Sequence, residues 1–394
     1  MSTTMALITL PLAIAQTVIW ASIFYIFPAL LPTWERETDW TKTELTGAFT
    51  LSLLLAAATS PLAGRLIDRG YGRELMLGGT LLAIACLLTL SQVATLWQFY
   101  AVWLVLGLCM SASLYEPCFA NLIRHLTDKA KPTITRITLV AGLAGTVAFP
   151  TAHWLTSIMN WQSAVICFAV GVAVTTLPLT AVALTRLQRQ FPVEAPTTTG
   201  STKSPPYSLI FWYLALAFLI ISFVHGMIIT HLLPLLAERS VPAATAILIA
   251  SCIGPMQVFG RLLMVATERH LSTQVTNMAC FVGMALGVSA LTIAGANVWL
   301  IGLFVLVHGS AYGVNSIVRP VLTREILGNK NFGEISGRIG GLSILGTAIA
   351  PFTGSLIWQV AGYSAMLYIS IALLLVGIIL LLAAISRGKS GQQI

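Results

Sequence analysis

Four polar residues within the hydrophobic stretch 298–327 have the types and spacing needed to bind a small polar molecule. They are His308, Tyr312, Asn315 and Arg319, separated by steps of four, three and four residues. In an α-helix these steps place all four side chains on one stripe. A stripe carrying an imidazole, a phenol, an amide and a guanidinium favours a polar cavity, although polar stripes also hold membrane helices together. We expect these four residues to bind substrate.

A second polar group interrupts the apolar run 97–123 at Tyr115, Glu116 and Asn121. Glu116 lies about ten residues, or ~15 Å, from the predicted helix end, close to the middle of a bilayer. Placing an ionisable side chain at that depth costs about 2.5–3.5 kcal/mol of insertion free energy, so we expect it to have a function or a partner. Glu116 either carries a proton or is permanently paired with an arginine. We expect Tyr115 and Asn121 to contact substrate.

Arg261 is a second buried cation, roughly 10 Å inside the predicted end of the run 243–266. A guanidinium presents a fork that matches a carboxylate, so Arg261 and Arg319 are candidates for binding an anionic substrate. Extension of Arg261 to the polar interface is the alternative. Gln257, one helical turn earlier, is a further candidate contact.

The composition explains why these residues stand out. The 394 residues are 57% hydrophobic and 9% charged, with a mean hydropathy of +0.88, whereas soluble domains carry about 25% charged residues. We therefore expect an all-α integral membrane protein with about twelve spans of ~20 residues. The predicted spans are residues 6–31, 46–63, 75–95, 97–123, 137–158, 162–185, 208–236, 243–266, 273–295, 298–327, 335–359 and 363–386.

The charge distribution predicts the orientation of these spans. With the N-terminus inside, all of the 21 Lys and Arg residues except Arg36, Lys42 and Arg239 fall toward the cytoplasm. This is the positive-inside bias, and it places both termini in the cytoplasm. The net charge of +8 therefore reflects membrane topology and does not indicate nucleic-acid binding. The first span has no basic segment before it and is expected to remain uncleaved.

The charged turn between the second and third predicted spans contains Gly64, Asp68, Arg69, Gly72 and Arg73. Their pattern, Gly-x-x-x-Asp-Arg followed by Gly and a basic residue, resembles the loop between the second and third helices of the major facilitator superfamily. A basic turn of an unrelated multi-span protein is the alternative. The resemblance implies two pseudo-symmetric six-helix bundles, transport by alternating access, and a gating role for these five residues.

The segment Asp39–Glu44 is similar to the start of the second helix in bacterial monocarboxylate and oxalate/formate porters, and a Thr of this segment is expected to begin that helix. In that branch the eighth helix typically bears an Asp four residues before an Arg, the two coupling proton and substrate. Arg261 matches the Arg, but Gln257 occupies the Asp position. Without an Asp at this position, the sequence leaves open whether transport is coupled to protons, or whether Glu116 serves as the proton carrier instead.

The two halves of the chain repeat each other weakly. Gly145–Pro150 is echoed by Gly346–Pro351 about 200 residues later, which predicts duplication of a unit with an even number of spans. Pro150 and Pro351 occupy equivalent places and are expected to bend their helices for gating or packing. The predicted organisation is a first half at 1–190, a cytoplasmic linker at 191–206 and a second half at 207–394.

Other chemistry has little support in the sequence. The six cysteines lie in apolar runs without Cys-x-x-Cys spacing, so we expect packing residues and no metal site. Nucleotide-binding, zinc-hydrolase and serine-hydrolase motifs are missing, so neither an enzyme nor a cofactor is predicted. His225 and His231, six residues apart, share no helical face and are expected to be structural, while Gln16 is a possible cavity residue.

These features together predict a secondary transporter that moves a small, monocarboxylate-like anion with a proton across a bacterial inner membrane. We expect it to function as a monomer in the bilayer. Two alternatives stay open. One is efflux of a toxic small molecule, or of a metalloid held by Cys109 and Cys118. The other is a membrane sensor that has lost transport.

The predicted topology can be tested by labelling a single cysteine. Residues 33–46 should be external, and residues 64–74 and 186–206 cytoplasmic, because of the placement of the basic residues. In a background without its native cysteines, Thr38→Cys should react with an impermeant maleimide in intact cells. Labelling that requires permeabilisation would reverse the orientation.

Overall fold

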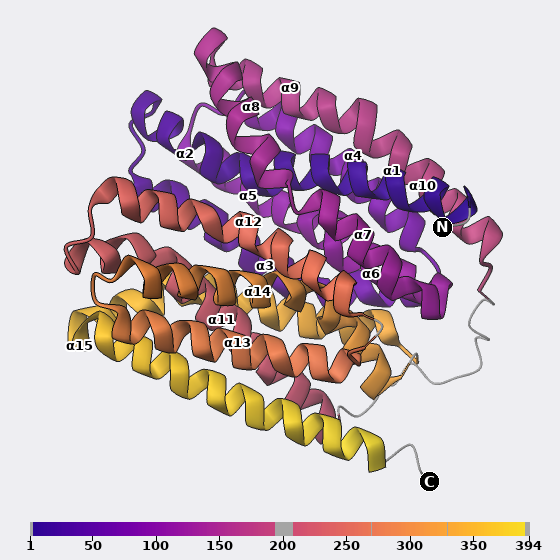
Figure 1. Ribbon diagram of the computed structural model, residues 1–394. Helices are drawn as coiled ribbons and strands as arrows, with labels where there is room; N and C mark the ends of the chain where they lie inside the picture. Colours follow the sequence, from indigo (N-terminus) through magenta and orange to yellow (C-terminus); the bar gives the residue numbers. More distant parts are fainter. Residues whose placement is uncertain (1–2, 194–207, 269, 329, 391–394) are drawn as a thin grey trace. The chain divides into compact units, whose positions relative to one another are not determined.

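A computed structural model describes residues 3–193, 208–268, 270–328 and 330–390 (Figure 1). Over these ranges the chain is helical and contains no strand. It divides into two compact units, treated separately below: Met1–Gly200 with Asn331–Gly341, and Ser201–Lys330 with Leu342–Ile394. Most of the predicted linker 191–206 lies outside the described residues, so the predicted domain boundaries stay a prediction.

The first unit consists of ten α-helices, counted over the described residues, joined by short irregular turns, with the start of α15 packed among them. Its elements are α1 (Thr3–Trp20), a π-helical turn (Ala21–Tyr25), α2 (Ile26–Glu37), α3 (Lys42–Asp68), α4 (Gly72–Leu90), α5 (Leu96–Ser113), α6 (Tyr115–Leu126), a 3-10 turn (Thr127–Lys129), α7 (Ala130–Ala141), α8 (Ala144–Ile158), α9 (Trp161–Gly171), a second π-helical turn (Val172–Thr176) and α10 (Leu177–Gln190).

The second unit is built from longer and less interrupted helices. They are α11 (Leu209–Glu238), α12 (Ala243–Thr267), α13 (Thr273–Ala294), α14 (Val298–Leu327) and the greater part of α15 (Phe332–Ser390).

The described residues contain 11 helical segments that are long and apolar enough to cross a membrane. Ten of them match the first ten predicted spans one to one. The eleventh, Phe332–Gly388, covers the last two predicted spans in 57 residues, more than twice the ~20 that one crossing needs. Gly362, with φ 75°, interrupts its helical backbone and separates the two crossings. The predicted fold class is thus confirmed, with twelve crossings in the described part of the chain.

The predicted start of the second span is also confirmed. Thr41 caps α3: its side chain accepts from the Glu44 backbone N–H, and the Glu44 carboxylate accepts from the Thr41 N–H at 2.8 Å. This reciprocal capping satisfies two backbone donors that a helix start otherwise leaves unpaired.

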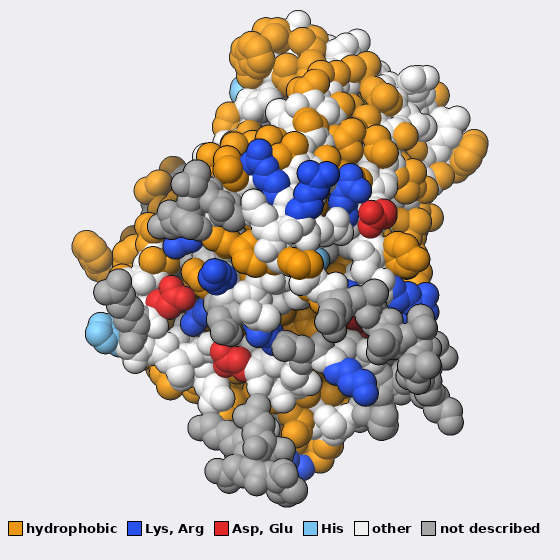
Figure 2. Space-filling model, turned by 90° about the vertical axis from the view of Figure 1, so that its right-hand side faces the viewer, with side chains coloured by type: hydrophobic (Ala, Val, Ile, Leu, Met, Phe, Trp, Pro, Cys, Tyr) orange, Lys and Arg blue, Asp and Glu red, His pale blue; other side chains and the backbone are white. Residues whose placement is uncertain are grey.

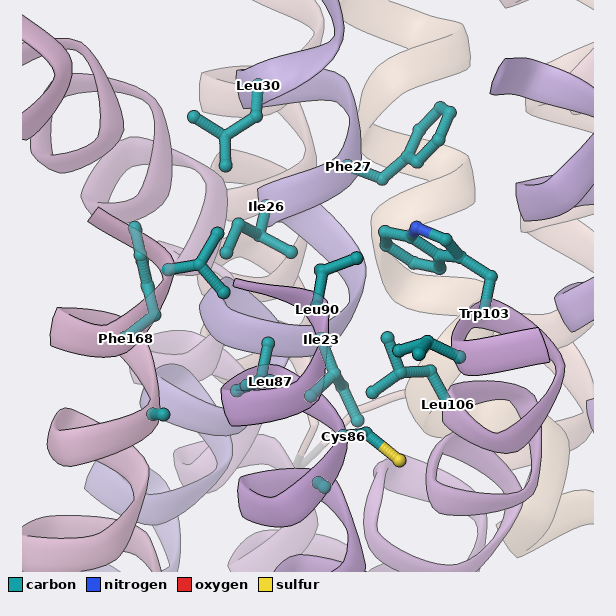
Figure 3. Close-up of a cluster of buried hydrophobic side chains, with 14 of the residues drawn as sticks. Ile23, Ile26, Phe27, Leu30, Cys86, Leu87, Leu90, Trp103, Leu106 and Phe168 are labelled. Carbon is teal, nitrogen blue, oxygen red and sulfur yellow. The ribbon is translucent and has the colours of Figure 1, made fainter. Parts of the chain in front are cut away.

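Large side chains fill the core of the first unit (Figure 3). Phe27 of α2 stacks on Phe49 of α3 at 4.4 Å, and meets Trp103 of α5 edge-on at 5.0 Å. Trp34 and Trp103 are fully buried, and edge-to-face packing of such rings adds to the stabilisation from burial. Aliphatic side chains from α4 and α9, such as Leu87, close the cluster.

Glycines bring α12 and α14 of the second unit into backbone contact. A Cβ atom added to Gly260 would lie 2.2 Å from the Ser310 carbonyl oxygen, and one added to Gly313 would lie 2.3 Å from that of Gln257. Close backbone approach through small residues is how membrane helices pack without a hydrophobic driving force. These contacts fix the position of the polar stripe on α14.

The surface in Figure 2 carries a group of Lys and Arg side chains bordered by a wide hydrophobic area. Leu, Val, Ile, Phe and Trp side chains are exposed along many of the helices. Exposed apolar surface of this extent is unfavourable in water and is expected where lipid covers the protein.

The α12–α14 contact can be tested by adding a single methyl group. Gly313→Ala should lower the unfolding temperature, because over-packing a close contact typically costs about 1–3 kcal/mol. The control is Gly302→Ala on the same helix, where an added Cβ meets no atom within 4 Å. The control should be neutral or slightly stabilising, since Ala is the better helix former. Equal unfolding temperatures for both variants in detergent would contradict the contact.

Candidate functional site

The polar stripe predicted in the tenth span lies on α14. His308 and Asn315 are 0% and 3% exposed, and Tyr312 and Arg319 are half-buried. All four belong to one continuous helix, so the sequence spacing does place them along one side. Their role in binding stays a prediction.

The structure adds His225 of α11 to this stripe. Its Nδ1 lies 3.1 Å from Nε2 of His308, within hydrogen-bonding distance. Its ring also stacks on Tyr312, with centroids 3.4 Å apart and planes 9° apart. The Tyr312 hydroxyl lies near the side chains of Ser222 and Thr347. The helical period relates His225 only to residues of its own helix, so it did not predict these contacts with α14.

Two buried atoms of the stripe have no hydrogen-bond partner among the described residues: His308 Nδ1 and Asn315 Oδ1. A buried polar atom left unpaired costs about 1–3 kcal/mol. The conclusion is independent of the assigned histidine tautomer and amide orientation, because each side chain keeps one unpaired end either way. These are positions where a ligand or a water molecule would recover a hydrogen bond.

Arg261 and Gln257 lie on α12 where it crosses α14. Arg261 is 5% exposed, and its Nε donates to the carbonyl oxygen of Gly313 at 3.0 Å. The backbone of Gln257 touches the same glycine. Arg261 therefore has a structural hydrogen bond beside Tyr312, whatever else its guanidinium binds.

The fourth span is interrupted at Leu114, between α5 and α6, where a continuous helix was expected. Leu114 has φ −81° and ψ −157°, and Pro117 has no N–H to donate to the Ser113 carbonyl four residues earlier. The buried Gln16 of α1 replaces that donor: its Nε2 donates to Ser113 O at 2.9 Å. Gln16 thus supports the break, a contact that the sequence did not predict.

The break places Glu116 in the first turn of α6, half-buried. Its carboxylate packs against Gly340, where an added Cβ would lie 2.6 Å from Oε2. A small cavity beside it, about 10 Å³ in volume, is also lined by Ser60 and Ser111. That is room for about one water molecule.

Tyr115 and Asn121 have different surroundings. Tyr115 stacks on Phe119 at 4.9 Å and contacts Trp20 at 4.7 Å, so it belongs to an aromatic group. Asn121 is buried, and its Nδ2 donates to Pro117 O at 3.0 Å and contacts Met76 Sδ at 3.6 Å. Asn121 therefore joins α6 to α4 within the first unit.

The charged turn after α3 joins the start of α15. The Asp68 carboxylate accepts from the backbone N–H groups of Gly333 at 2.7 Å and Glu334 at 2.8 Å. A carboxylate at a helix start satisfies unpaired donors and opposes the positive end of the helix dipole. Gly64 permits the approach, because a Cβ there would lie 1.9 Å from Gly333 O. Arg65 adds an ion pair with Glu334 at 2.9 Å.

The other residues of the turn have separate contacts. Gly72 leaves space for the Asn121 side chain, which an added Cβ would overlap. Arg73 lies 3.5 Å from Glu74, and Arg69 is exposed. Gly70 adopts φ 96°, which Gly reaches without strain.

The sequence profile of the Major Facilitator Superfamily matches residues 12–276. The chain belongs to this superfamily. Membership agrees with the residues of the turn that first indicated it, and with the twelve crossings. It makes the protein a multi-pass membrane transporter and not an enzyme.

Solved structures of Major Facilitator Superfamily and other transporters share the fold. A bacterial homologue of the iron transporter ferroportin, in an outward-facing state, has a TM-score of 0.73 at 15% identity, covering 98% of this chain and 100% of its own. The human organic anion transporter MFSD10 (TETRAN) has 0.72 at 17%, covering 96% and 98%. FucP in the outward conformation has 0.69 at 14%, covering 95% and 97%. At these identities the likeness concerns the fold alone. No curated protein sequence matches the chain.

The remaining predicted residues of this transporter are also located. Pro150 lies inside α8. Pro351 lies inside α15, and its carbonyl accepts from His231 Nε2 at 3.0 Å. The thiol of Cys109 lies near that of Cys86. Among the described residues, no three His, Cys, Asp or Glu side chains come together as metal ligands would.

Proposed function

We propose that the chain is a secondary transporter that moves a small organic anion by alternating access, coupled to protons. Its relationship is closest to the monocarboxylate and oxalate/formate branch, with both termini in the cytoplasm of a bacterial cell and the spans in the inner membrane. The observation that carries the proposal is the α14 stripe, where Arg319 lies in line with Asn315, Tyr312 and His308 inside a span. The human organic anion transporter shows that this fold can serve such a substrate.

The charge of the stripe favours an anion. Its four side chains include one guanidinium and no carboxylate. A guanidinium is always protonated and matches a carboxylate with two parallel hydrogen bonds. Arg261 donates to Gly313 O one residue from Tyr312, which adds a second positive charge near the stripe. Two cations and no acidic side chain on these positions disfavour a cationic substrate.

Glu116 is the proposed proton carrier. It stands at the helix break, beside a cavity with space for about one water molecule. A water there gives a proton a route to and from the carboxylate. The position expected to carry an Asp on the eighth helix holds Gln257, which does not ionise, so Glu116 is the acidic side chain within a span that suits coupling.

The turn from Gly64 to Arg73 is the proposed gating element. The Asp68 carboxylate holds the first residues of α15 in the first unit, while the rest of that helix belongs to the second unit. Loss and recovery of this cap would accompany the conformational cycle. The cap consists of hydrogen bonds at a helix end, which water can replace.

The anion proposal predicts that charge alone at position 319 is insufficient. Arg319→Lys keeps the positive charge but replaces a planar fork by a point charge, so affinity should fall about tenfold or more. A thermal-shift screen with organic acids identifies a binding acid, because a ligand stabilises the native state by mass action. An unchanged affinity for that acid in Arg319→Gln would show that Arg319 does not bind it.

The coupling proposal predicts a selective loss in Glu116→Gln, which mimics the protonated carboxyl. Reconstituted protein should still exchange the identified acid in counterflow, because exchange needs no net proton movement. Accumulation driven by a pH gradient should disappear. Full pH-driven uptake by a well-folded Glu116→Gln protein would exclude the coupling role.

A purely structural role of Glu116 gives a different result. If Glu116 only pairs with an arginine, the Gln variant leaves that arginine's charge unbalanced, at a cost of about 3–5 kcal/mol. The unfolding temperature should then fall, and counterflow should be lost together with pH-driven uptake.

A further inference from the structure

The unpaired polar atoms of the α14 stripe carry information about the substrate's functional groups. His308 Nδ1 and Asn315 Oδ1 are buried and have no hydrogen-bond partner among the described residues. Their residues are 0% and 3% exposed. Two such atoms on one stripe need an explanation, because buried polar atoms are normally paired. A ligand that supplies hydrogen bonds provides one.

The ring of His308 is held in place before any ligand binds. Its Nε2 lies 3.1 Å from His225 Nδ1, and the ring of Phe304 packs on it at 5.0 Å. Gly287 of α13 allows the approach of its backbone, since a Cβ there would lie 3.0 Å from the His308 Cβ. His225 is in turn fixed by its stack on Tyr312. A ring fixed in this way loses little freedom when a ligand bonds to Nδ1.

A hydroxyl group suits both unpaired atoms. Nδ1 of His308 is a donor or an acceptor according to the tautomer, and the unpaired end of Asn315 is an oxygen or an amide nitrogen according to its orientation. A hydroxyl donates and accepts, so it pairs with either form. An ionised carboxylate only accepts and is already matched by the guanidinium of Arg319.

The spacing along α14 orders these groups on the ligand. Along the helix axis, Asn315 is about 6 Å and His308 about 16 Å from the backbone position of Arg319. The long Arg319 side chain leaves the helix toward its N-terminus and covers part of that distance, so a six-carbon ligand can reach from the guanidinium toward His308. We infer that the substrate is a polyhydroxylated carboxylate, with its carboxylate at Arg319 and hydroxyls at Asn315 and His308. The inference rests on the proposed anion transport and narrows its substrate class. A simple monocarboxylate leaves both atoms unpaired.

Gluconate and hexanoate test the inference, because they share charge and chain length and differ in hydroxyl groups. Purified protein should bind gluconate at least about tenfold more tightly than hexanoate, measured by calorimetry and by thermal shift. Asn315→Leu and His308→Leu should each reduce this ratio severalfold. Arg319→Gln should weaken the binding of both acids.

Asn277 of α13 provides the matched control. It is 0% exposed, and both polar atoms of its amide are buried without a partner, but it lies off the stripe. Asn277→Leu should leave the gluconate-to-hexanoate ratio at its wild-type value. If Asn315→Leu and Asn277→Leu have the same effect, the unpaired atoms report buried water or packing, and the inference is overturned. Asn315→Thr serves as a second variant if the leucine protein elutes as aggregate.

The outcomes separate this inference from the proposed function. Hexanoate binding as tightly as gluconate, with both weakened by Arg319→Gln, would overturn the hydroxyl inference and leave anion transport standing. Failure of both acids and of every acid in the screen to stabilise the protein would overturn the anion proposal and the inference with it.

Discussion

Inside the hydrocarbon of a bilayer no water can satisfy a polar group, so a backbone carbonyl without its helical donor needs a side-chain donor. Gln16 donates to Ser113 O, which Pro117 leaves without its helical partner. Arg261 donates to Gly313 O. In each case a side chain from one helix donates to a backbone carbonyl of another helix, and at Ser113 it replaces the donor that Pro117 lacks.

This constraint changes how a polar residue in a span should be interpreted. A buried arginine or glutamine is not by itself a sign of a ligand, because backbone carbonyls near prolines and close helix crossings also need donors. Arg261 shows the ambiguity, since it is both a structural donor and a cation beside Tyr312. The inference of a ligand therefore rests on two buried atoms of the α14 stripe that have no partner among the described residues, His308 Nδ1 and Asn315 Oδ1.

Much of the fold could be predicted from the sequence because the signals are local. Length and hydropathy give the spans, a threonine in the segment Asp39–Glu44 gives a helix start, and the helical period gives the common side of His308 and Asn315. The break at Leu114 could not be predicted, although Pro117 is visible, because Gln16 makes it tolerable from about 100 residues away in the sequence. The hydrogen bond of His225 with His308 likewise depends on how two helices pack.

The turn after α3 could be predicted only in part. Its sequence pattern indicated the superfamily. The need for Gly at position 70 follows from the structure, where its φ is 96°. The need for Gly64 follows only from the backbone of Gly333 lying against it. The partner of Asp68 likewise follows only from the structure, in which its carboxylate accepts from the N–H of Gly333 at the start of α15.

The lack of water in the bilayer core also limits where a transporter can break hydrogen bonds during its cycle. A hydrogen bond deep in the bilayer has no substitute when it is lost, so Gln16 with Ser113 and Arg261 with Gly313 suit parts that move as rigid bodies. The Asp68 cap is different, because it lies at the ends of α3 and α15, where solvent can take over the freed N–H groups. In its ion pair with Glu334, Arg65 is 40% accessible and Glu334 8%, so solvent reaches the arginine side of this contact. A reversible gate requires a contact that is specific in geometry but needs little free energy to open. This argues for placing the moving contacts at the helix ends and the fixed contacts at mid-span.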